Sequence, residues 1–388
     1  MQKRSISLLL MFFTVFFQVL GVENIKTGAD QPEKYLPLLK GKRVGLVVNH
    51  TSVTAKSHLV DFLIDENVDI KVIFAPEHGF RGNASAGEEI QDGLDSKTGV
   101  RVISLYGKNR KPTPQNLQDI DMMVFDIQDV GCRFYTYIST LHLVMEACAE
   151  NNIPLLVLDR PNPNGDYVAG PILIPELKSF VGMDPIPIVH GCTVGELAQM
   201  INGEKWTDTI ACKLEVIKVA DYSHKMKYEL PIPPSPNLPN NLSVRLYPSL
   251  CFFEATTVSV GRGTAFPFQV LGGLQENLGD FQFVPVEIPG VALDPINMNK
   301  TCYGIDLREL ATVPNFTLQY FLDFYRKFEF ESDFINREKW FDTLAGTPVL
   351  LQKIREGLTE KEILQTFEPE INRYKEIRKK YLLYPDFE

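Results

Sequence analysis

The chain has 388 residues, of which 44% are hydrophobic and 23% are charged, and its formal net charge is −10. This composition is that of an ordinary globular protein, and the length favours two domains. Because an acidic chain repels the phosphates of nucleic acids, we expect no DNA or RNA partner.

The N-terminus has the features of a secretory signal peptide. Lys3 and Arg4 form a basic start, the apolar stretch Ile6–Leu20 follows, and Gly21 offers a small residue near a cleavage site. The stretch is shorter than a typical membrane span, although an uncleaved anchor is the alternative. We therefore expect residues 1–21 to be removed. The mature protein would then be periplasmic or secreted, with no stable membrane association.

The first half of the chain predicts an α/β domain. Five apolar runs predict strands at Arg43–Val48, Ile70–Ala75, Val100–Leu105, Met122–Phe125 and Leu155–Leu158, with a further strand at Leu214–Val219. Helical segments are predicted at Lys56–Glu66, Leu117–Asp121, Ser139–Asn151 and Val194–Asn202. Thr193 could cap the last of these, with Glu196 at the spacing of a capping box. Strands separated by helices indicate a doubly wound parallel sheet. Residues 22–235 are therefore predicted to form a Rossmann-like domain.

The composition changes at Pro231–Asn241, which is too rich in proline for a helix or an inner strand. This segment is either a linker or a stiff loop that lines a cleft between domains. Short strands are then predicted at Ala255–Val260, Phe281–Ile288 and Thr301–Asp306. Helices are predicted at Leu318–Phe330, Val349–Glu356, Glu360–Thr366 and Pro369–Tyr381. Residues 236–388 are therefore expected to form a smaller α+β domain docked against the first.

The predicted strands each end in polar residues, and open α/β sheets bind ligands outside the carboxyl ends of their strands. Glu77 is the first candidate, because it follows an apolar strand and lies in a turn restricted by Pro76 and Gly79. A carboxyl group held against apolar walls has a raised pKa and can serve as a general acid. The alternative is a turn glutamate that pairs with Arg81.

Motifs for cofactors and metals do not occur. The chain has no G-x-G-x-x-G after its first strand, no phosphate-binding loop and no G-x-S-x-G elbow, so we expect no nucleotide cofactor and no serine triad. His50, His78 and His190 could suggest a metal site with Asp126 or Asp129, but their spacing matches no ligand motif. Histidines that hydrogen-bond substrate or backbone are the favoured interpretation. The six scattered cysteines are expected to be buried free thiols.

The polar residues that follow two other predicted strands each allow two interpretations. Asp126 and Asp129 could orient a water or pair with Arg133, and Asp129 could instead cap a helix. Arg160 has a planar fork that can grip a substrate carboxylate, or it can form an internal network with Asp159.

Aromatic and glycine-flanked residues add further candidates. Tyr135 and Tyr137 offer phenols of the kind found in pockets for sugars or carboxylates. Beyond the proline-rich segment, Glu254 precedes the block Gly261–Thr264, in which two glycines flank Arg262. This block indicates a close backbone approach to a ligand or to the other domain, or else an ordinary turn.

Eight blocks, taken together, resemble one family. They are Gly45–Thr51, Pro76–Gly82, Ser104–Gly107, Phe125–Gly131, Arg133–Tyr137, Leu158–Pro163, Pro234–Pro239 and Gly261–Thr264. They resemble the NamZ-type exo-β-N-acetylmuramidases over nearly all of the mature chain. The resemblance implies a Rossmann-like domain joined to a smaller C-terminal domain, with the active cleft between them. It also implies release of terminal N-acetylmuramic acid from peptidoglycan fragments, with Glu77 of the Pro-Glu-His-Gly block as the catalytic residue.

The residues fit such a glycoside hydrolase, which needs two carboxylates, or one with a substitute, and no cofactor. The candidate partners of Glu77 are Asp126, Asp129 and Glu254. Because muramic acid carries a lactyl carboxylate, an arginine is expected in its pocket, and the candidates are Arg133, Arg160 and Arg262. The full set of predicted substrate-binding residues is Asn49, His50, His78, Arg81, Arg133, Tyr135, Tyr137, Asp159, Arg160, His190, Asn237 and Arg262.

We therefore predict a metal-independent, exo-acting hydrolase of muropeptide-derived chains in cell-wall turnover and recycling. Two rival functions are a non-catalytic periplasmic protein that binds sugars or muropeptides, and a metal-dependent hydrolase.

Overall fold

The computed structural model describes residues 25–77, 79–80, 92–207 and 210–388. The predicted signal peptide, His78 and Arg81 lie outside these ranges. Within them, we find no helix with both the length and the apolar character that a membrane span requires.

A seven-stranded sheet forms the N-terminal half. In the order β3-β4-β2-β1-β5-β6-β9, its strands are Gly93–Leu94, Arg101–Ser104, Asp69–Ala75, Arg43–Val48, Met122–Asp126, Leu155–Leu158 and Leu214–Ile217. All neighbours are parallel except β3, which is antiparallel to β4. The chain first builds the sheet outward from β1 through β2, and then restarts on the other side of β1 with β5. The predicted fold class is confirmed, and the strand order reverses beside β1, where α/β sheets bind ligands.

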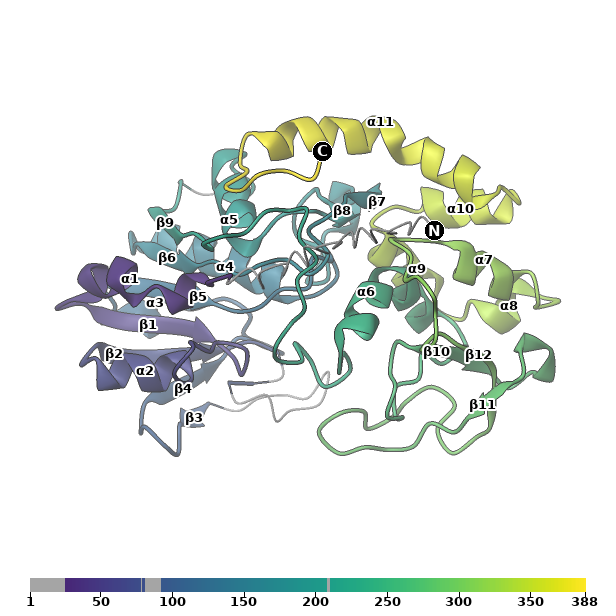
Figure 1. Cartoon of the computed structure of the whole chain (residues 1–388), viewed down its shortest axis with the longest axis horizontal. Coiled ribbons are helices and arrows are strands. Elements are labelled where there is room, and N and C mark those ends of the chain that lie inside the picture. The colour runs from purple at the N-terminus through teal and green to yellow at the C-terminus, as the bar shows by residue number, and fades with distance from the viewer. Residues whose placement is uncertain (1–24, 78, 81–91, 208–209) are drawn as a thin grey trace, which may run out of the picture.

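Helices cover both faces of this sheet (Figure 1). They are α1 (Pro32–Leu39), α2 (Leu59–Asp65), α3 (Pro114–Leu117), α4 (Tyr137–Glu150) and α5 (Val194–Gly203). In β1, Val44 and Leu46 pack in a core cluster with α1 and α2, whereas Val47 packs in the cluster that contains α4 and α5. Both faces of the strand are buried, which is why it contains no polar side chain from Val44 to Val48 instead of alternating.

Local capping explains where two of these helices begin. The Thr193 hydroxyl accepts a hydrogen bond from the Glu196 amide, and the Glu196 carboxylate accepts one from the Thr193 amide, as predicted for a capping box. The helix predicted at Leu117–Asp121 instead begins at Pro114, because Thr113 caps it and proline favours the first helical position.

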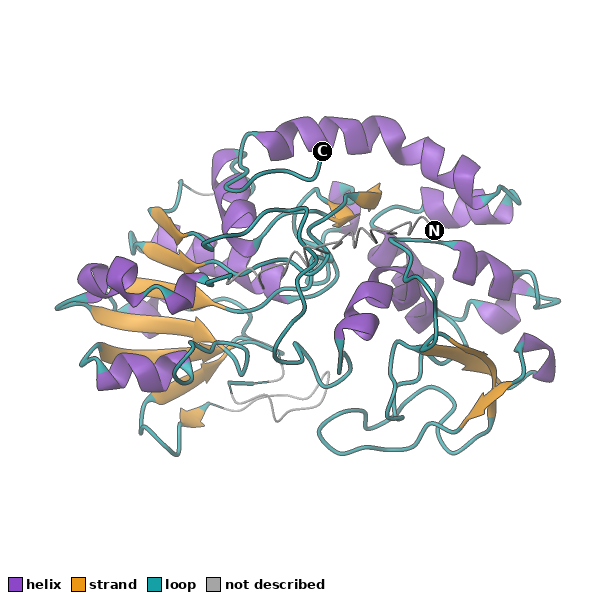
Figure 2. Cartoon of the chain, in the orientation of Figure 1, coloured by secondary structure: helices purple, strands orange, loops and turns teal. Residues whose placement is uncertain are grey.

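The C-terminal half contains a small sheet and a group of helices, at the opposite end of the molecule from the large sheet (Figure 2). The sheet is antiparallel, in the order β10-β12-β11, with strands Val270–Gly273, Cys302–Asp306 and Phe281–Phe283. The helices are α6 (Asn241–Leu250), α7 (Gln319–Tyr325), α8 (Glu331–Phe334), α9 (Glu338–Ala345), α10 (Val349–Arg355) and α11 (Glu360–Lys379). A separate hairpin pairs β7 (Ala169–Ile172) with β8 (Pro187–Val189). Short 3₁₀ turns occupy Gly28–Asp30, Pro175–Leu177, Cys251–Ala255 and Glu276–Leu278.

Several predictions for this half are wrong in detail. No strand covers Ala255–Val260, where a 3₁₀ turn ends and only isolated bridges follow. The strand predicted at Phe281–Ile288 stops at Phe283, shortly before Pro285, whose nitrogen cannot donate to a sheet. α6, α9 and β10 were not predicted.

The two helices predicted around Pro369 are one helix, α11. Proline inside a helix removes one backbone hydrogen bond, but here the buried residues lie on both sides of it. Phe367 precedes Pro369, and Tyr374 and Arg378 follow it. Because packing holds both halves of α11 against the body, the helix continues through Pro369.

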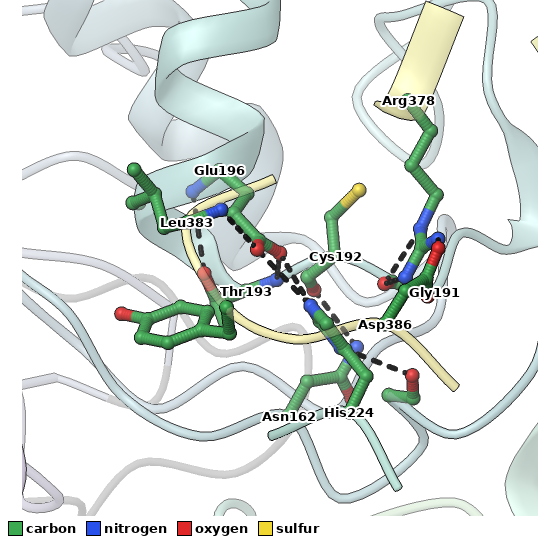
Figure 3. Close-up of polar contacts among 12 residues, drawn as sticks. Asn162, Gly191, Cys192, Thr193, Glu196, His224, Arg378, Leu383 and Asp386 are labelled. Carbon is green, nitrogen blue, oxygen red and sulfur yellow. Dashed lines mark hydrogen bonds and ion pairs between the residues drawn. The ribbon is translucent and has the colours of Figure 1, made fainter. Parts of the chain in front are cut away.

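The end of α11 and the tail after it return to the Rossmann-like half (Figures 1 and 3). Arg378 donates two hydrogen bonds to the Gly191 carbonyl, at 2.9 and 2.7 Å, and forms an ion pair with Asp386. The Leu383 amide donates to Glu196. One hydrophobic cluster also joins β1 to the aromatic residues of the C-terminal half. The predicted division at residues 235 and 236 stays a prediction, and the two halves share one core.

Candidate active site

Segments from both halves enclose a cavity of about 430 Å³, a volume that includes its opening to solvent. It is lined by Glu77, Phe134, Tyr135, Thr136, Tyr137, Ser235, Asn237, Leu238, Tyr247, Arg262 and Phe268. These residues come from the turn after β2, the loop that enters α4, the proline-rich segment, α6 and the Gly261–Thr264 block. The proline-rich segment therefore lines a cleft, which was one of its two predicted roles.

Glu77 supplies the carboxylate of this cavity and is only partly buried. The Thr136 hydroxyl donates to Glu77 Oε2 at 2.8 Å, and the Tyr106 hydroxyl also hydrogen-bonds to the carboxylate. Burial, and then the negative charge of Glu77, raise the pKa of Tyr106 to about 12, so this phenol stays a donor at neutral pH. Two hydroxyl groups thus hold the carboxylate in place.

Two tyrosines connect Glu77 to the proline-rich segment. The Tyr137 hydroxyl lies 3.4 Å from the Glu77 carbonyl, and the Tyr135 hydroxyl donates to the Pro234 carbonyl at 2.7 Å. The two rings meet edge to face with their centroids 4.8 Å apart. Burial, and then the charge of Glu77, raise the pKa of Tyr137. Both tyrosines line the cavity, where they were predicted to bind substrate.

Arg262 is the cavity's guanidinium group. Its Nε and Nη2 atoms donate to Glu254 Oε1 at 3.0 and 2.5 Å, and its guanidinium carbon lies 5.1 Å from the centre of the Phe268 ring. Arg262 also lines a second cavity of about 950 Å³, open to solvent, together with Glu254 and Arg337. Of the three carboxylates predicted as partners of Glu77, Glu254 lines the second cavity, and it reaches the cavity of Glu77 only through its bond to Arg262.

The glycines beside Arg262 permit close backbone packing. Gly263 has a φ of +78°, and a Cβ atom there would lie 2.4 Å from the Val286 carbonyl oxygen. The Val286 amide in turn donates to the Gly263 carbonyl. This contact fixes the loop that carries Arg262, and the close approach is to neighbouring backbone.

Arg160 and Asp126 form a buried ion pair away from the cavity. Arg160 Nε and Nη2 contact the two oxygens of Asp126 at 2.6 and 2.9 Å, and neither side chain is more than 4% exposed. Arg160 also donates to the Val53 carbonyl. The predicted internal network therefore exists, with Asp126 in the place of Asp159, and neither Arg160 nor Asp126 lines the cavity.

Arg133 is fully buried, and both of its Nη atoms bind backbone, whereas Nε has no hydrogen-bond partner among the described residues. It donates to the carbonyls of Pro171, Ile186, Leu344 and Ala345 at 2.7 to 2.9 Å. Burial lowers the pKa of its guanidinium to about 10. These bonds join the β7–β8 hairpin to the end of α9, so Arg133 pairs with no carboxylate and faces no cavity.

Asp129, His190 and Asp159 are also buried outside the cavity lining. Asp129 accepts a hydrogen bond from the Gly131 amide and lies 3.5 Å from His190 Nε2, and Thr136 occupies the N-cap of α4. Asp129 thus forms a turn and does not cap that helix.

Asp159 anchors the C-terminal tail. It accepts hydrogen bonds from the Thr193 hydroxyl at 2.7 Å, the Gly195 amide at 2.7 Å and the Tyr384 hydroxyl at 2.5 Å. Burial raises the pKa of Asp159 to about 6, although these hydrogen bonds oppose the shift. All of these hydrogen-bond donors to Asp159 are residues of the protein itself.

Asn49 and His50 join the end of β1 to neighbouring loops. Asn49 Oδ1 accepts from the amide and the hydroxyl of Thr51, and His50 Nε2 lies 2.9 Å from the Pro233 carbonyl oxygen. Asn49 also contacts the hydroxyl of Tyr137, which lines the cavity. Asn49 therefore supports the cavity wall through Tyr137, and His50 supports the proline-rich segment through Pro233.

Sequence reasoning missed several residues at the site, and four of them have a clear role. Tyr106 and Thr136 orient Glu77, and Tyr247 and Phe268 form an aromatic wall. Tyr106 and Thr136 lay inside blocks that carried the family resemblance, which was the available signal. Tyr247 belongs to the unpredicted α6, and no local pattern marks it.

In the parts of the chain that the structure describes, no three His, Cys, Asp or Glu side chains come together as a possible ligand set. All six cysteines are free and buried, as expected.

A carboxylate and a guanidinium in an aromatic-walled cavity, beside the carboxyl edge of a Rossmann-like sheet, are typical of an enzyme that acts on a small polar substrate. The chain matches the model of the N-terminal domain of the exo-β-N-acetylmuramidase NamZ over residues 44–242 and that of its C-terminal domain over residues 245–384. The protein therefore belongs to the NamZ family.

Relatives support this assignment along the whole chain. The peptidoglycan β-N-acetylmuramidase NamZ of Bacillus subtilis (strain 168) is 40% identical over 93% of this chain and 92% of its own. Two crystal structures of DUF1343 family proteins from Bacteroides fragilis NCTC 9343 are similar in fold. One has a TM-score of 0.86 at 44% identity and covers 94% of this chain and 99% of its own, and the other has 0.80 at 31%, covering 93% and 99%.

Proposed function

We propose that this protein is an exo-acting β-N-acetylmuramidase that releases terminal N-acetylmuramic acid from peptidoglycan fragments, with Glu77 as its general acid. The observation that carries this proposal is the position of Glu77. Its carboxylate is held by the Thr136 and Tyr106 hydroxyls and lines a cavity between the two halves of a NamZ-family chain. In its protonated form, Glu77 would donate to the glycosidic oxygen as the bond to the leaving sugar breaks.

The walls of the cavity support exolytic cleavage. Tyr135, Tyr247 and Phe268 bound it, and the proline-rich segment forms another wall. Because walls from both halves of the chain surround this space, we expect it to take one terminal sugar and not the inside of a polymer.

We propose that Arg262 binds the lactyl carboxylate of N-acetylmuramic acid. Of the three arginines predicted for this role, it is the one that lines the cavity, while Arg133 and Arg160 are buried among protein partners. Two of its nitrogens bind Glu254, which fixes the guanidinium plane, and Nη1 has no hydrogen bond to a described residue. Charge-assisted pairing of this kind is typical of carboxylate recognition by arginine.

We further propose a periplasmic or secreted location. Its support is the basic start and apolar stretch of residues 1–21, and a substrate that lies outside the cytoplasm. Cell fractionation with an antibody, and N-terminal sequencing of the mature protein, would test it. Mature protein that starts at Met1 would contradict it.

The decisive experiment is product analysis on a defined glycan oligomer with N-acetylmuramic acid at its non-reducing end. We expect stepwise release of that sugar alone, with the same rate in the presence of a chelator. Early internal fragments would contradict the exolytic pocket, and loss of activity with the chelator would contradict the metal-independent mechanism. Binding of the oligomer without turnover would instead indicate a sugar-binding protein without catalytic activity.

A further inference from the structure

The cavity of Glu77 contains a buried polar atom that no described residue satisfies. Asn237 lines the cavity and is 1% exposed, and its Oδ1 atom has no hydrogen-bond partner among the described residues. Buried acceptors are nearly always hydrogen-bonded, because leaving one unpaired loses its interactions with water. An unpaired acceptor at a ligand cavity is therefore a candidate recognition atom.

The orientation of the Asn237 amide is set by its neighbours. Its Nδ2 atom donates to the Val291 carbonyl at 2.8 Å. A carbonyl oxygen only accepts hydrogen bonds, so the nitrogen must face Val291 and Oδ1 must occupy the other branch of the amide. The backbone is held as well, because the Asn237 amide donates to the Ser235 hydroxyl and the Leu238 amide donates to the Ser235 carbonyl.

Aromatic rings form the apolar wall of the same cavity. Phe134 and Tyr247 meet edge to face with centroids 5.3 Å apart, and Tyr247 meets Phe268 in the same way at 5.0 Å. All three residues line the cavity together with Asn237. The cavity thus offers one fixed hydrogen-bond acceptor and an apolar surface, which a methyl group can contact.

We infer that Asn237 recognises the 2-acetamido group of the sugar: Oδ1 accepts the hydrogen bond of its N–H, and its methyl group lies against the wall of Phe134, Tyr247 and Phe268. An acetamido group presents this combination of a single donor beside a methyl group. A sugar hydroxyl would satisfy Oδ1 but would leave the aromatic wall without an apolar partner. The inference rests on the proposed function and assigns one specificity contact within it.

The test uses two chromogenic β-glycosides of 3-O-lactyl-glucose that differ at one position. One carries the 2-acetamido group, and the other carries a 2-acetoxy ester, which keeps the carbonyl and methyl but replaces N–H with oxygen. We expect wild-type kcat/KM to be about 10- to 100-fold higher for the acetamide, since the ester leaves a buried acceptor unpaired. In Asn237→Ala the preference should disappear.

Asn240→Ala is the matched control. Asn240 lies in the same segment and caps α6, but it does not line the cavity. This variant should keep the preference for the acetamide even if its stability falls. Thermal unfolding monitored by circular dichroism reports whether each variant is folded.

The outcomes separate the inference from the function on which it rests. A wild-type protein that cleaves neither glycoside would contradict the proposed function. A wild-type protein that cleaves both equally would overturn the inference without any variant. It would also be overturned if Asn237→Ala kept the acetamide preference, or if this change instead removed discrimination against a 4-deoxy substrate, which would assign Oδ1 to the 4-hydroxyl group.

Discussion

Two groups of charged residues lie near the carboxyl ends of the large sheet, and they differ in their exposure. In the buried group, Arg160 and Asp126 pair with each other, and the Nη atoms of Arg133 bind four backbone carbonyls. Arg133 Nε has no partner among the described residues, but the residue is fully buried and does not line the cavity. In the cavity group, Glu77 and Arg262 are partly exposed, and Arg262 Nη1 has no hydrogen bond to a described residue. A polar residue after a strand is therefore a site candidate only when its side chain also borders a cavity.

The largest expected effect is on the cavity side. Glu77→Gln keeps the shape and the hydrogen bond from Thr136 but removes the transferable proton. We expect kcat to fall by about 10²- to 10⁴-fold, the usual contribution of a general acid, with little change in melting temperature. Steady-state kinetics on a chromogenic N-acetylmuramic acid glycoside measures this.

Glu362→Gln is the control for that change, because Glu362 caps α11 far along the chain and lines no described cavity. It should retain wild-type kcat. A folded Glu77→Gln protein with wild-type turnover would remove Glu77 from the mechanism.

In the buried group, we expect a substitution to lower stability. Arg160→Met leaves Asp126 as an uncompensated buried charge and should cost about 3–5 kcal/mol of unfolding free energy. Urea denaturation measures this. The control is Arg43→Met, which breaks the solvent-accessible Arg43–Asp121 pair at the other end of the sheet and should lower the unfolding free energy far less. Equal losses of unfolding free energy in the two variants would show that the buried pair stabilises the fold no more than the Arg43–Asp121 pair does.

A smaller effect sharpens the role of Arg262. Arg262→Ala should lower kcat/KM for the muramic acid glycoside by a factor that corresponds to about 1.5–3 kcal/mol, and should remove its preference over the N-acetylglucosamine glycoside. Arg308→Ala is a close control, because Arg308 also pairs with a carboxylate, Asp306, and also lies over a phenylalanine ring. If Arg262→Ala retains the preference, another residue reads the lactyl group.

The smallest effect concerns orientation of the acid. Thr136→Val keeps the side-chain shape but removes the hydroxyl donor to Glu77, so we expect kcat to fall by a factor that corresponds to about 1 kcal/mol. Thr140→Val, one turn further along α4, should leave kcat unchanged. A Thr136→Val protein with wild-type kcat would exclude this role.

Local pattern was enough for much of the fold. β1 and β6 begin and end at the predicted residues, because a strand buried on both faces is a continuous apolar run bounded by polar residues. The start of α5 was predicted from the capping box of Thr193 and Glu196. Local pattern failed at Pro369, where a proline suggested a break but packing of Phe367 and Tyr374 holds one helix together.

The sequence by itself determined the doubly wound sheet, the family and the position of Glu77 at a strand end, because these depend on residues close together in the chain. Only the tertiary structure decided which arginine faces the cavity. Arg133 donates to the Ala345 carbonyl, 212 residues away, and does not line the cavity, whereas Arg262 lines the cavity and binds Glu254, only eight residues away. Which arginine reaches the cavity depends on how distant segments of the chain pack together, and the residues next to each arginine do not contain that information.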